Sequence, residues 1–173
     1  RPLLPHLRQP IGIWLAEGAK PFSTDLTAAF GYDLGGILEF APVKYKTYEG
    51  DVPLEIPILD ESMYQFPNVK NRDVILFDDV ADTTRTALKF LEDVRWRGGK
   101  PTDGVFILEK PETSPWRERI KIATWDKDVR KWALFAGDDL WYEGHGMDTD
   151  GEGRGDETSG IRWRRDMEPQ KVE

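Results

Sequence analysis

The chain has 173 residues, of which 39% are hydrophobic, and a net charge of −8, so it is long and apolar enough for one folded domain with a buried core. The absence of cysteine excludes a disulfide framework, a thiolate metal site and a cysteine nucleophile. The negative charge argues against nucleic acid and anionic membranes as partners, and no apolar run approaches the roughly 20 residues of a membrane-spanning helix.

The first third of the chain predicts short strands and one helix. The expected elements are a buried strand over Ile11–Leu15, a helix over Phe22–Phe30, a strand over Ile37–Tyr45 and a strand over Leu54–Ile58. The turn Gly18–Pro21 precedes the helix, and Gly31 is expected to end it. Pro57 cannot donate a ladder hydrogen bond, so the last of these strands is expected at a sheet edge.

The middle of the chain carries the clearest pattern of alternating elements. It predicts a strand over Asp73–Phe77, a helix with an apolar face from Ala87 to Val94, and strands over Gly104–Leu108, Ile120–Thr124 and Lys131–Phe135. The unit from Val74 to Leu108 is a strand–helix–strand crossover, which is right-handed between parallel strands. The sequence therefore predicts an α/β fold with a mostly parallel sheet flanked by helices.

The last thirty residues, 144–173, are rich in glycine and acidic residues and are expected to form a loop or tail. Asp148 and Asp150 resemble the start of an EF-hand loop, but Ser159 stands where that loop needs its final glutamate. This argues against calcium binding. The basic segment Ile161–Arg165 is expected to pair with the acidic surface of the chain rather than with nucleic acid.

Three aspartates, Asp78, Asp79 and Asp82, lie between the strand Asp73–Phe77 and the following helix. The carboxyl end of a strand in an open α/β sheet is where ligands bind. Four residues then open the helix: Thr83, Thr84, Arg85 and Thr86. Free N–H groups and the positive dipole end of a helix bind phosphate, and carboxylates beside a phosphate usually hold Mg²⁺ or sugar hydroxyls. Each aspartate alone is explained by strand ending or helix capping, but the combination is not.

Two other classes of protein end a strand in paired acids. A P-loop NTPase also needs the run Gly-x-x-x-x-Gly-Lys-Ser/Thr, which this sequence lacks. A receiver domain begins with such a strand, whereas here several elements precede it. Neither class accounts for the pattern.

The run VILFDDVADTTRTA, Val74–Ala87, resembles the phosphoribosyl-diphosphate (PRPP) loop of type I phosphoribosyltransferases, in which two acids and two apolar residues precede Asp-Thr-Gly-x-Thr. Further segments are similar to the purine branch of that family, the hypoxanthine, guanine and xanthine enzymes, and occur in the family's order: Leu15–Leu26, Val43–Tyr45, Phe106–Pro111 and Trp132–Asp139. The matches extend from about Ile11 to Asp139.

The resemblance implies roles for the acidic loop. Asp78 and Asp79 would hold the ribose hydroxyls of PRPP, partly through Mg²⁺. Asp82 would lie near N7 of the purine as the catalytic acid/base. The residues Thr83–Thr86 would bind the 5′-phosphate.

The resemblance also implies a base site and a diphosphate site. Lys110 would donate to the 6-oxo group of the base, and Trp132 would stack on its ring; a surface strand cap and a core tryptophan are the structural alternatives. Asp139 would help to hold a metal ion on the diphosphate, although it could equally be a solvated loop residue with Asp138 as the ligand. The diphosphate loop would be formed by Glu17, Gly18 and Ala19.

Two departures affect the phosphate contacts. Thr84 replaces the family's loop glycine, which is costly if that position needs a positive φ. Glu17 places a carboxylate where a diphosphate is expected, and His145 falls where an arginine is expected. The alternatives to a purine enzyme are therefore a non-catalytic protein that binds PRPP or a nucleotide and regulates a partner, and a phosphoribosyltransferase with a different acceptor.

Taken together, the sequence predicts a phosphoribosyltransferase-like domain over residues 1–143, with a small hood, and a C-terminal extension over residues 144–173. The expected activity is Mg²⁺-dependent transfer from PRPP to a 6-oxopurine. The expected partners are these small molecules and a second copy in a homodimer or higher homo-oligomer. The N-terminal run Arg1–Pro5 lacks the layout of a secretory signal. The absence of cysteine fits a reducing compartment, so a cytoplasmic location is expected.

Overall fold

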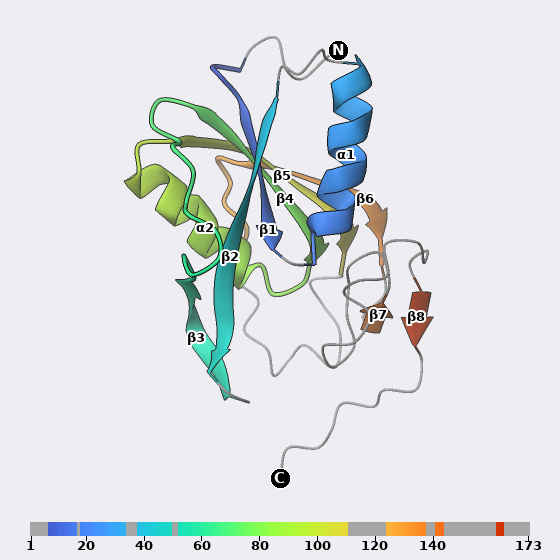
Figure 1. Ribbon diagram of the computed structural model, residues 1–173. Coiled ribbons are helices and arrows are strands. Elements are labelled where there is room, and N and C mark those ends of the chain that lie inside the picture. The colour runs from blue at the N-terminus through green and yellow to red at the C-terminus, as the bar shows by residue number, and fades with distance from the viewer. Residues whose placement is uncertain are drawn as a thin grey trace.

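The computed structural model describes residues 7–16, 18–33, 38–49, 52–110, 124–137, 141–143 and 162–164. These residues form a twisted sheet with a helix on each face and a separate two-stranded ribbon (Figure 1). None of the helices formed by the described residues has the length and hydrophobicity needed to span a membrane.

The central sheet has the strand order β3-β2-β1-β4-β5-β6. The strands are β1 (Ile11–Ala16), β2 (Glu39–Glu49), β3 (Val52–Leu59), β4 (Asp73–Ala81), β5 (Lys100–Glu109) and β6 (Arg130–Ala136). All neighbouring pairs are parallel except β2 and β3, which are antiparallel. This confirms the predicted mostly parallel sheet, and β3 lies at its edge as Pro57 indicated.

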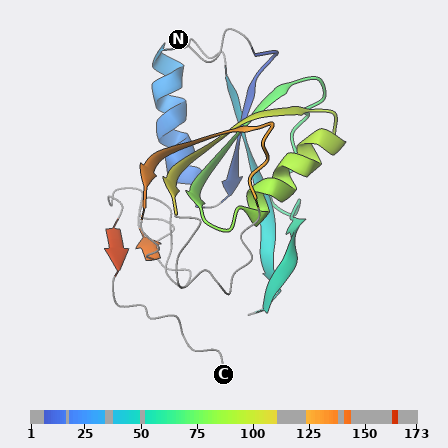
Figure 2. The ribbon, with the colours of Figure 1, turned by 180° about the vertical axis from the view of Figure 1, so that it is seen from behind.

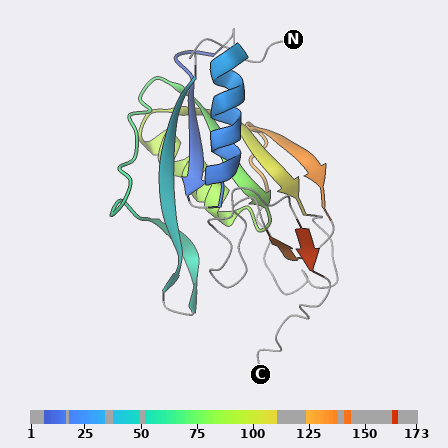
Figure 3. The same ribbon diagram turned by 45° about the vertical axis from the view of Figure 1, so that its right-hand side comes forward.

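The two helices lie on opposite faces of the sheet, as Figure 3 shows. Helix α1 (Lys20–Asp33) follows β1, and helix α2 (Arg85–Trp96) connects β4 to the parallel strand β5. The predicted crossover is confirmed. Pro21 is in the first turn of α1, where its missing N–H costs nothing. The prediction that Gly31 ends this helix was wrong, because α1 continues to Asp33.

Several strands are longer than their apolar runs indicated, and β4 and β2 show why. β4 continues through the acid pair to Ala81, because its ladder with β5 extends to the pairing of Ala81 with Glu109. β2 continues to Glu49, because β3 pairs with its polar second half. Backbone pairing with a neighbouring strand therefore determines these ends, and hydrophobicity does not.

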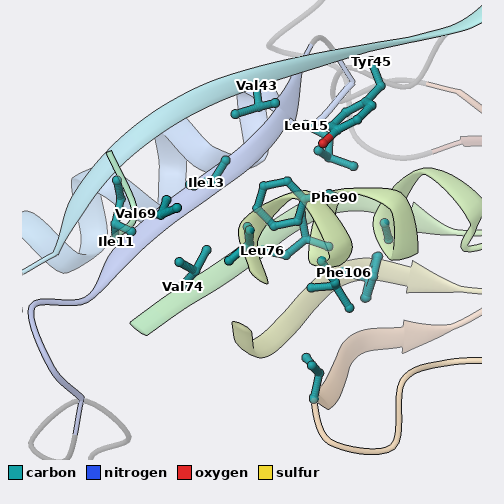
Figure 4. Packing of buried hydrophobic residues seen from close by; sticks show 14 of the residues in the cluster. Ile11, Ile13, Leu15, Val43, Tyr45, Val69, Val74, Leu76, Phe90 and Phe106 are labelled. Atoms are coloured by element: carbon teal, nitrogen blue, oxygen red, sulfur yellow. The ribbon is translucent and has the colours of Figure 1, made fainter. Parts of the chain in front are cut away.

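Apolar side chains pack on both faces of the sheet. Under α2 the cluster includes Val74, Leu76, Phe90 and Phe106, which Figure 4 shows between β4, β5 and the helix. On the α1 face a second cluster is built around Phe77, whose ring contacts those of Phe22 and Phe40. The acid pair that follows Phe77 on β4 therefore extends from a rigid, fully packed strand.

The C-terminal part of the chain contributes the antiparallel ribbon of β7 (Trp141–Glu143) and β8 (Arg162–Arg164). It lies near the edge of the main sheet at which the parallel strands end (Figure 2). The pairing joins residues on both sides of the expected boundary at position 143. Of the predicted strand Ile120–Thr124, residues 120–123 lie outside the described residues, and Thr124 is in a coil.

A tyrosine links β2 to α2 inside the core. The Tyr45 side chain is buried, and its hydroxyl donates a hydrogen bond of 2.7 Å to Oδ2 of Asp93. Lys89 forms an ion pair with the same carboxylate. Burial raises the pKa of Tyr45 far above its usual value, and the bond to Asp93 and its charge raise it further, while Arg97 acts in the opposite direction.

We expect the protein to lose stability as the pH rises above about 10, in part through Tyr45. The unfolded tyrosine releases its proton there and the folded one does not, so the unfolded state binds fewer protons and the free energy of unfolding falls. Tyr45→Phe should lower this free energy by about 1 kcal/mol at pH 8 and show a smaller decrease above pH 10. Urea unfolding from pH 8 to 11 measures both. Tyr48→Phe, at an exposed tyrosine, is the control, and parallel curves for wild type and Tyr45→Phe would contradict the expectation.

Candidate functional site

The candidate site lies at the edge of the sheet where the parallel strands end, and Figure 1 shows α2 starting at this edge. Three connections meet there: the turn from β1 to α1, the loop from β4 to α2 and the residue after β5. The sequence placed Gly18 and Ala19, the aspartate loop and Lys110 on these connections. The structure therefore brings most of the predicted site residues to one edge, as expected for a parallel sheet.

The acid pair is held by its own backbone. The N–H of Asp79 donates to Oδ1 of Asp78 at 3.0 Å, and the N–H of Val80 donates to Oδ1 of Asp79 at 2.8 Å. Burial raises the pKa of Asp78 well above its usual range, and the adjacent Asp79 carboxylate raises it further. Two carboxylates this close favour a bound cation or a shared proton, because their mutual repulsion is costly away from water.

Gly18 lies directly against the acid pair. A Cβ atom added at Gly18 would be only 2.3 Å from Oδ2 of Asp79. The next residue, Ala19, is fully buried, and its N–H donates to the carbonyl of Leu15 at 3.3 Å. The predicted diphosphate loop and the predicted ribose-binding acids are therefore in contact. Glu17, the third residue assigned to that loop, lies outside the described residues.

The start of α2 adopts the conformation that its sequence makes costly. Thr84 is the N-cap residue, with φ of 58° and ψ of 0°, in the left-handed region that β-branched residues rarely occupy. Its hydroxyl donates to the carbonyl of Thr83 at 2.7 Å and forms no capping hydrogen bond. Thr84 replaces the glycine of the family's loop, but the backbone keeps the positive φ that glycine would adopt. The side chain of Thr84 does not cap the N-terminus of the helix.

We expect Thr84→Gly to raise the free energy of unfolding by about 1 kcal/mol, because about 1–3 kcal/mol of strain is released and part is offset by the entropy of glycine. Thermal or urea unfolding measures this. Gly98→Ala is the opposite control. Gly98 has φ of 80°, and a Cβ atom added there would meet Cγ of Lys70 at 3.6 Å, an ordinary van der Waals distance, so alanine there should destabilise through backbone strain. An unchanged or lower stability of Thr84→Gly would contradict the strain assignment.

Lys110 and Asp82, the residues that the resemblance assigns to the base, form an ion pair. The Nζ of Lys110 is 3.5 Å from Oδ2 of Asp82. The backbone supports this placement, since the Lys110 N–H donates to the carbonyl of Ala81 at 3.2 Å. The lysine side chain is 12% exposed and the aspartate side chain 46% exposed. The pair places one hydrogen-bond donor and one acceptor side by side.

The structure does not place Trp132 beside this pair, and the stacking role implied by the resemblance stays a prediction. Trp132 is in the first half of β6 opposite Val105, about 10 Å along the strand from the pairing of Phe135 with Leu108. Its indole N–H donates to Oδ1 of Asp103 at 2.8 Å, and Arg130 binds the other oxygen. The tryptophan therefore has a structural partner away from the carboxyl edge. Asp139, the other residue assigned on this segment, lies outside the described residues.

The described residues contain no cluster of three or more acidic or histidine side chains that would bind a metal ion by itself. Asp78 and Asp79 nevertheless fit Mg²⁺, which is usually held by one or two carboxylates together with substrate oxygens. The high pKa of Asp78 is consistent with a position that needs a cation. An ion here would therefore be shared with a ligand.

Sequence reasoning missed the link between Tyr45 and Asp93, because it considered Val43–Tyr45 only as a strand. The signal available was weak: a tyrosine two residues after a valine on the buried face of β2. A buried phenol needs a partner, but the sequence does not show that α2 supplies one.

No protein-family model matches the sequence, and no curated protein matches it. Solved structures do match. The chain superposes with a TM-score of 0.71 and 16% identity on a glutamic acid mutant, which was solved in an analysis of an invariant aspartic acid in hypoxanthine phosphoribosyltransferases (HPRTs). The match covers 96% of this chain and 80% of that one. Trypanosoma cruzi hypoxanthine phosphoribosyltransferase superposes with a TM-score of 0.70 at 17% identity, as a lysine-to-arginine mutant with ternary substrates, over 96% and 80% of the two chains. The same enzyme with the product IMP gives 0.70 and 17%, over 93% and 80%. The chain therefore has the type I phosphoribosyltransferase fold found in the purine enzymes.

Proposed function

We propose that the protein is a purine phosphoribosyltransferase, which transfers the 5-phosphoribosyl group of PRPP to a 6-oxopurine and releases diphosphate. The observation that carries the proposal is the Lys110–Asp82 pair at 3.5 Å, in the same segment as the acid pair and the start of α2. A donor for the 6-oxo group and an acceptor for the ring proton then lie next to the ribose and phosphate contacts. The shared fold with hypoxanthine phosphoribosyltransferases supports the same assignment.

In this mechanism the N–H groups of the first turn of α2 hold the 5′-phosphate. Asp78 and Asp79 hold the ribose hydroxyls and, together with PRPP, would hold a Mg²⁺ ion, which would supply positive charge for the departing diphosphate. The bond from the anomeric carbon to diphosphate breaks as the bond to the ring nitrogen of the base forms. Lys110 donates to the 6-oxo group while Asp82 manages the proton at N7, which orients the base and stabilises its charge.

The direct test is a turnover assay with PRPP and Mg²⁺ and, separately, hypoxanthine, guanine, xanthine and adenine. Nucleotide formation from one or more 6-oxopurines supports the proposal and names the acceptor. The absence of nucleotide, with PRPP or a nucleotide still bound, would overturn the assignment as a purine transferase and favour either the binding protein or the transferase with a different acceptor named above. Adenine as the preferred substrate would overturn the role given to Lys110.

The position of Trp132 favours one alternative, a phosphoribosyltransferase with a different acceptor. Because the indole is bonded to Asp103 at a distance from the base site, no aromatic side chain has been assigned to the face of the ring. An acceptor that needs no stacking partner would fit this arrangement. Consumption of PRPP with a non-purine acceptor, and with none of the four bases, would establish this alternative.

A further inference from the structure

The β2–β3 hairpin projects beyond the end of its neighbour β1. β2 pairs with β1 as far as Lys44, whose partner Ala16 is the last residue of β1. From Tyr45 onward β2 pairs with β3. We call Tyr45–Glu49 together with Val52–Leu59 the hairpin arm. At about 3.3 Å per residue the arm extends about 16 Å past the last β1 pair, on the side of the carboxyl edge (Figure 1).

Tyr45 is the residue from which the arm starts. It is the first residue of β2 beyond the β1 pairing, and its partner Leu59 is the last residue of β3. The Tyr45 side chain is 7% exposed, and Figure 4 shows it reaching from β2 toward α2. The hydrogen bond from its hydroxyl to the side chain of Asp93 therefore attaches the base of the arm to helix α2.

Helix α2 carries that attachment to the candidate site. Asp93 lies about 12 Å along the helix axis from Arg85, where the helix begins. Between them Ala87, Phe90 and Leu91 are buried against the sheet, so the helix is held as a rigid body. The Lys89 ion pair fixes the Asp93 carboxylate on the helix surface. A movement of the arm relative to Asp93 is thus a movement relative to the phosphate-binding end of α2.

We propose that the Tyr45–Asp93 hydrogen bond is a positioning contact that holds the hairpin arm in a fixed relation to the phosphate-binding end of α2. Two-stranded hairpins are marginally stable on their own, so contacts with the rest of the fold set the orientation of the arm. Leu59 packs against the core, and the Tyr45 hydroxyl adds a directional bond to the helix. The bond selects one orientation of the arm, which projects beyond β1 on the side of the candidate site. The consequence for turnover rests on the proposed function; the attachment of the arm does not.

The test uses the full-length chain and two measurements. The first is amide hydrogen exchange, resolved for the arm and for α2 without ligand. The second is the steady-state rate of nucleotide formation. Tyr45→Phe and Asp93→Leu remove the bond, whereas Asp93→Asn keeps an acceptor oxygen for the phenol. Tyr48→Phe removes a hydroxyl from the same arm at a residue that is 56% exposed, and Lys89→Met removes only the ion pair.

In Tyr45→Phe and Asp93→Leu we expect exchange of the arm amides to rise about tenfold relative to those of α2, and kcat to fall about tenfold with the KM for PRPP changed less than about twofold. The variants Asp93→Asn, Tyr48→Phe and Lys89→Met should remain close to wild type in both amide exchange and kcat. The double variant with both Tyr45→Phe and Asp93→Leu should lose no more than either single one.

Equal exchange of the arm in wild type and Tyr45→Phe would overturn the inference whether or not the protein turns over PRPP. A loosened arm with unchanged kcat would overturn the positioning role. If Asp93→Leu fails to fold, Tyr45→Phe and Asp93→Asn still decide the matter. A wild-type protein without any transferase activity would remove the proposed function, and arm exchange would then decide the attachment alone.

Discussion

Asp82→Asn is expected to lower kcat for nucleotide formation by about 10²–10⁴-fold, the usual contribution of a positioned acid or base. The asparagine keeps the shape of the side chain and can still accept a hydrogen bond from Lys110. It cannot take up a proton from the base. Asp82 is about half exposed and lies in the loop before α2, so the free energy of unfolding should change by less than about 0.5 kcal/mol.

The measurement is kcat and KM for both substrates, with the affinity for PRPP in the presence of Mg²⁺ determined separately by calorimetry. Affinity for PRPP should change little, because Asp82 is assigned to the base. Glu92→Gln, at an exposed position on α2, controls for the loss of one negative charge. Wild-type turnover by Asp82→Asn would remove the proposed mechanism, and an equal loss in Glu92→Gln would show that the effect is electrostatic and general.

Gly18→Ala is expected to lower both stability and activity, because the added methyl group would overlap with the side chain of Asp79. The added methyl group would lie 2.3 Å from Oδ2 and 2.9 Å from Cγ of Asp79, so the turn or the acid pair must move. The Asp79 side chain is fixed by its bond to the Val80 N–H, which limits how far it rotates. We expect a loss of about 1–3 kcal/mol in stability and up to about 100-fold in kcat/KM for PRPP.

A second substitution separates the steric cause from a general loss of fold. In the double variant Gly18→Ala with Asp79→Ala, the obstructing carboxylate is gone, so stability should recover by more than the sum of the single effects predicts. Activity should not recover, because the acid pair is broken. Urea unfolding and PRPP kinetics on all four proteins measure both. Additive stability effects would show that Gly18 is required for a reason other than its contact with Asp79.

The pattern of apolar runs was sufficient for the parallel sheet, the crossover through α2 and the edge position of β3. The acids of β4 were predicted as a ligand site because they follow a buried strand, whereas Lys110 was assigned from the resemblance to the purine enzymes. The ends of the helices and strands were predicted less well. Pairing with β5 extends β4 through Asp78 and Asp79, since tertiary contacts override local preference. Helix α1 likewise continues past Gly31, to Asp33.

Trp132 shows why site residues outside a continuous motif are harder to predict. Its place in the site depends on the register of β6 against β5, which pairs Trp132 with Val105. A sequence pattern gives alternation along a strand but not its register against a neighbour. The bond to Asp103 joins residues on different strands, and neither residue alone indicates it. By contrast, Asp82 and Thr84 lie in one short loop, so their proximity follows from the chain itself.

The position of β1 between β2 and β4 has a consequence for synthesis on the ribosome. Ile11 pairs with Glu39 on one side and with Val74 on the other. β1 thus has one unpaired edge after β2 has emerged, and that edge stays open until β4 follows. At roughly 5–20 residues per second this lasts for several seconds, during which an apolar strand edge is available to other chains. Non-local parallel pairing is also slow to form, so the yield of folded protein should depend on the rate of translation between β2 and β4.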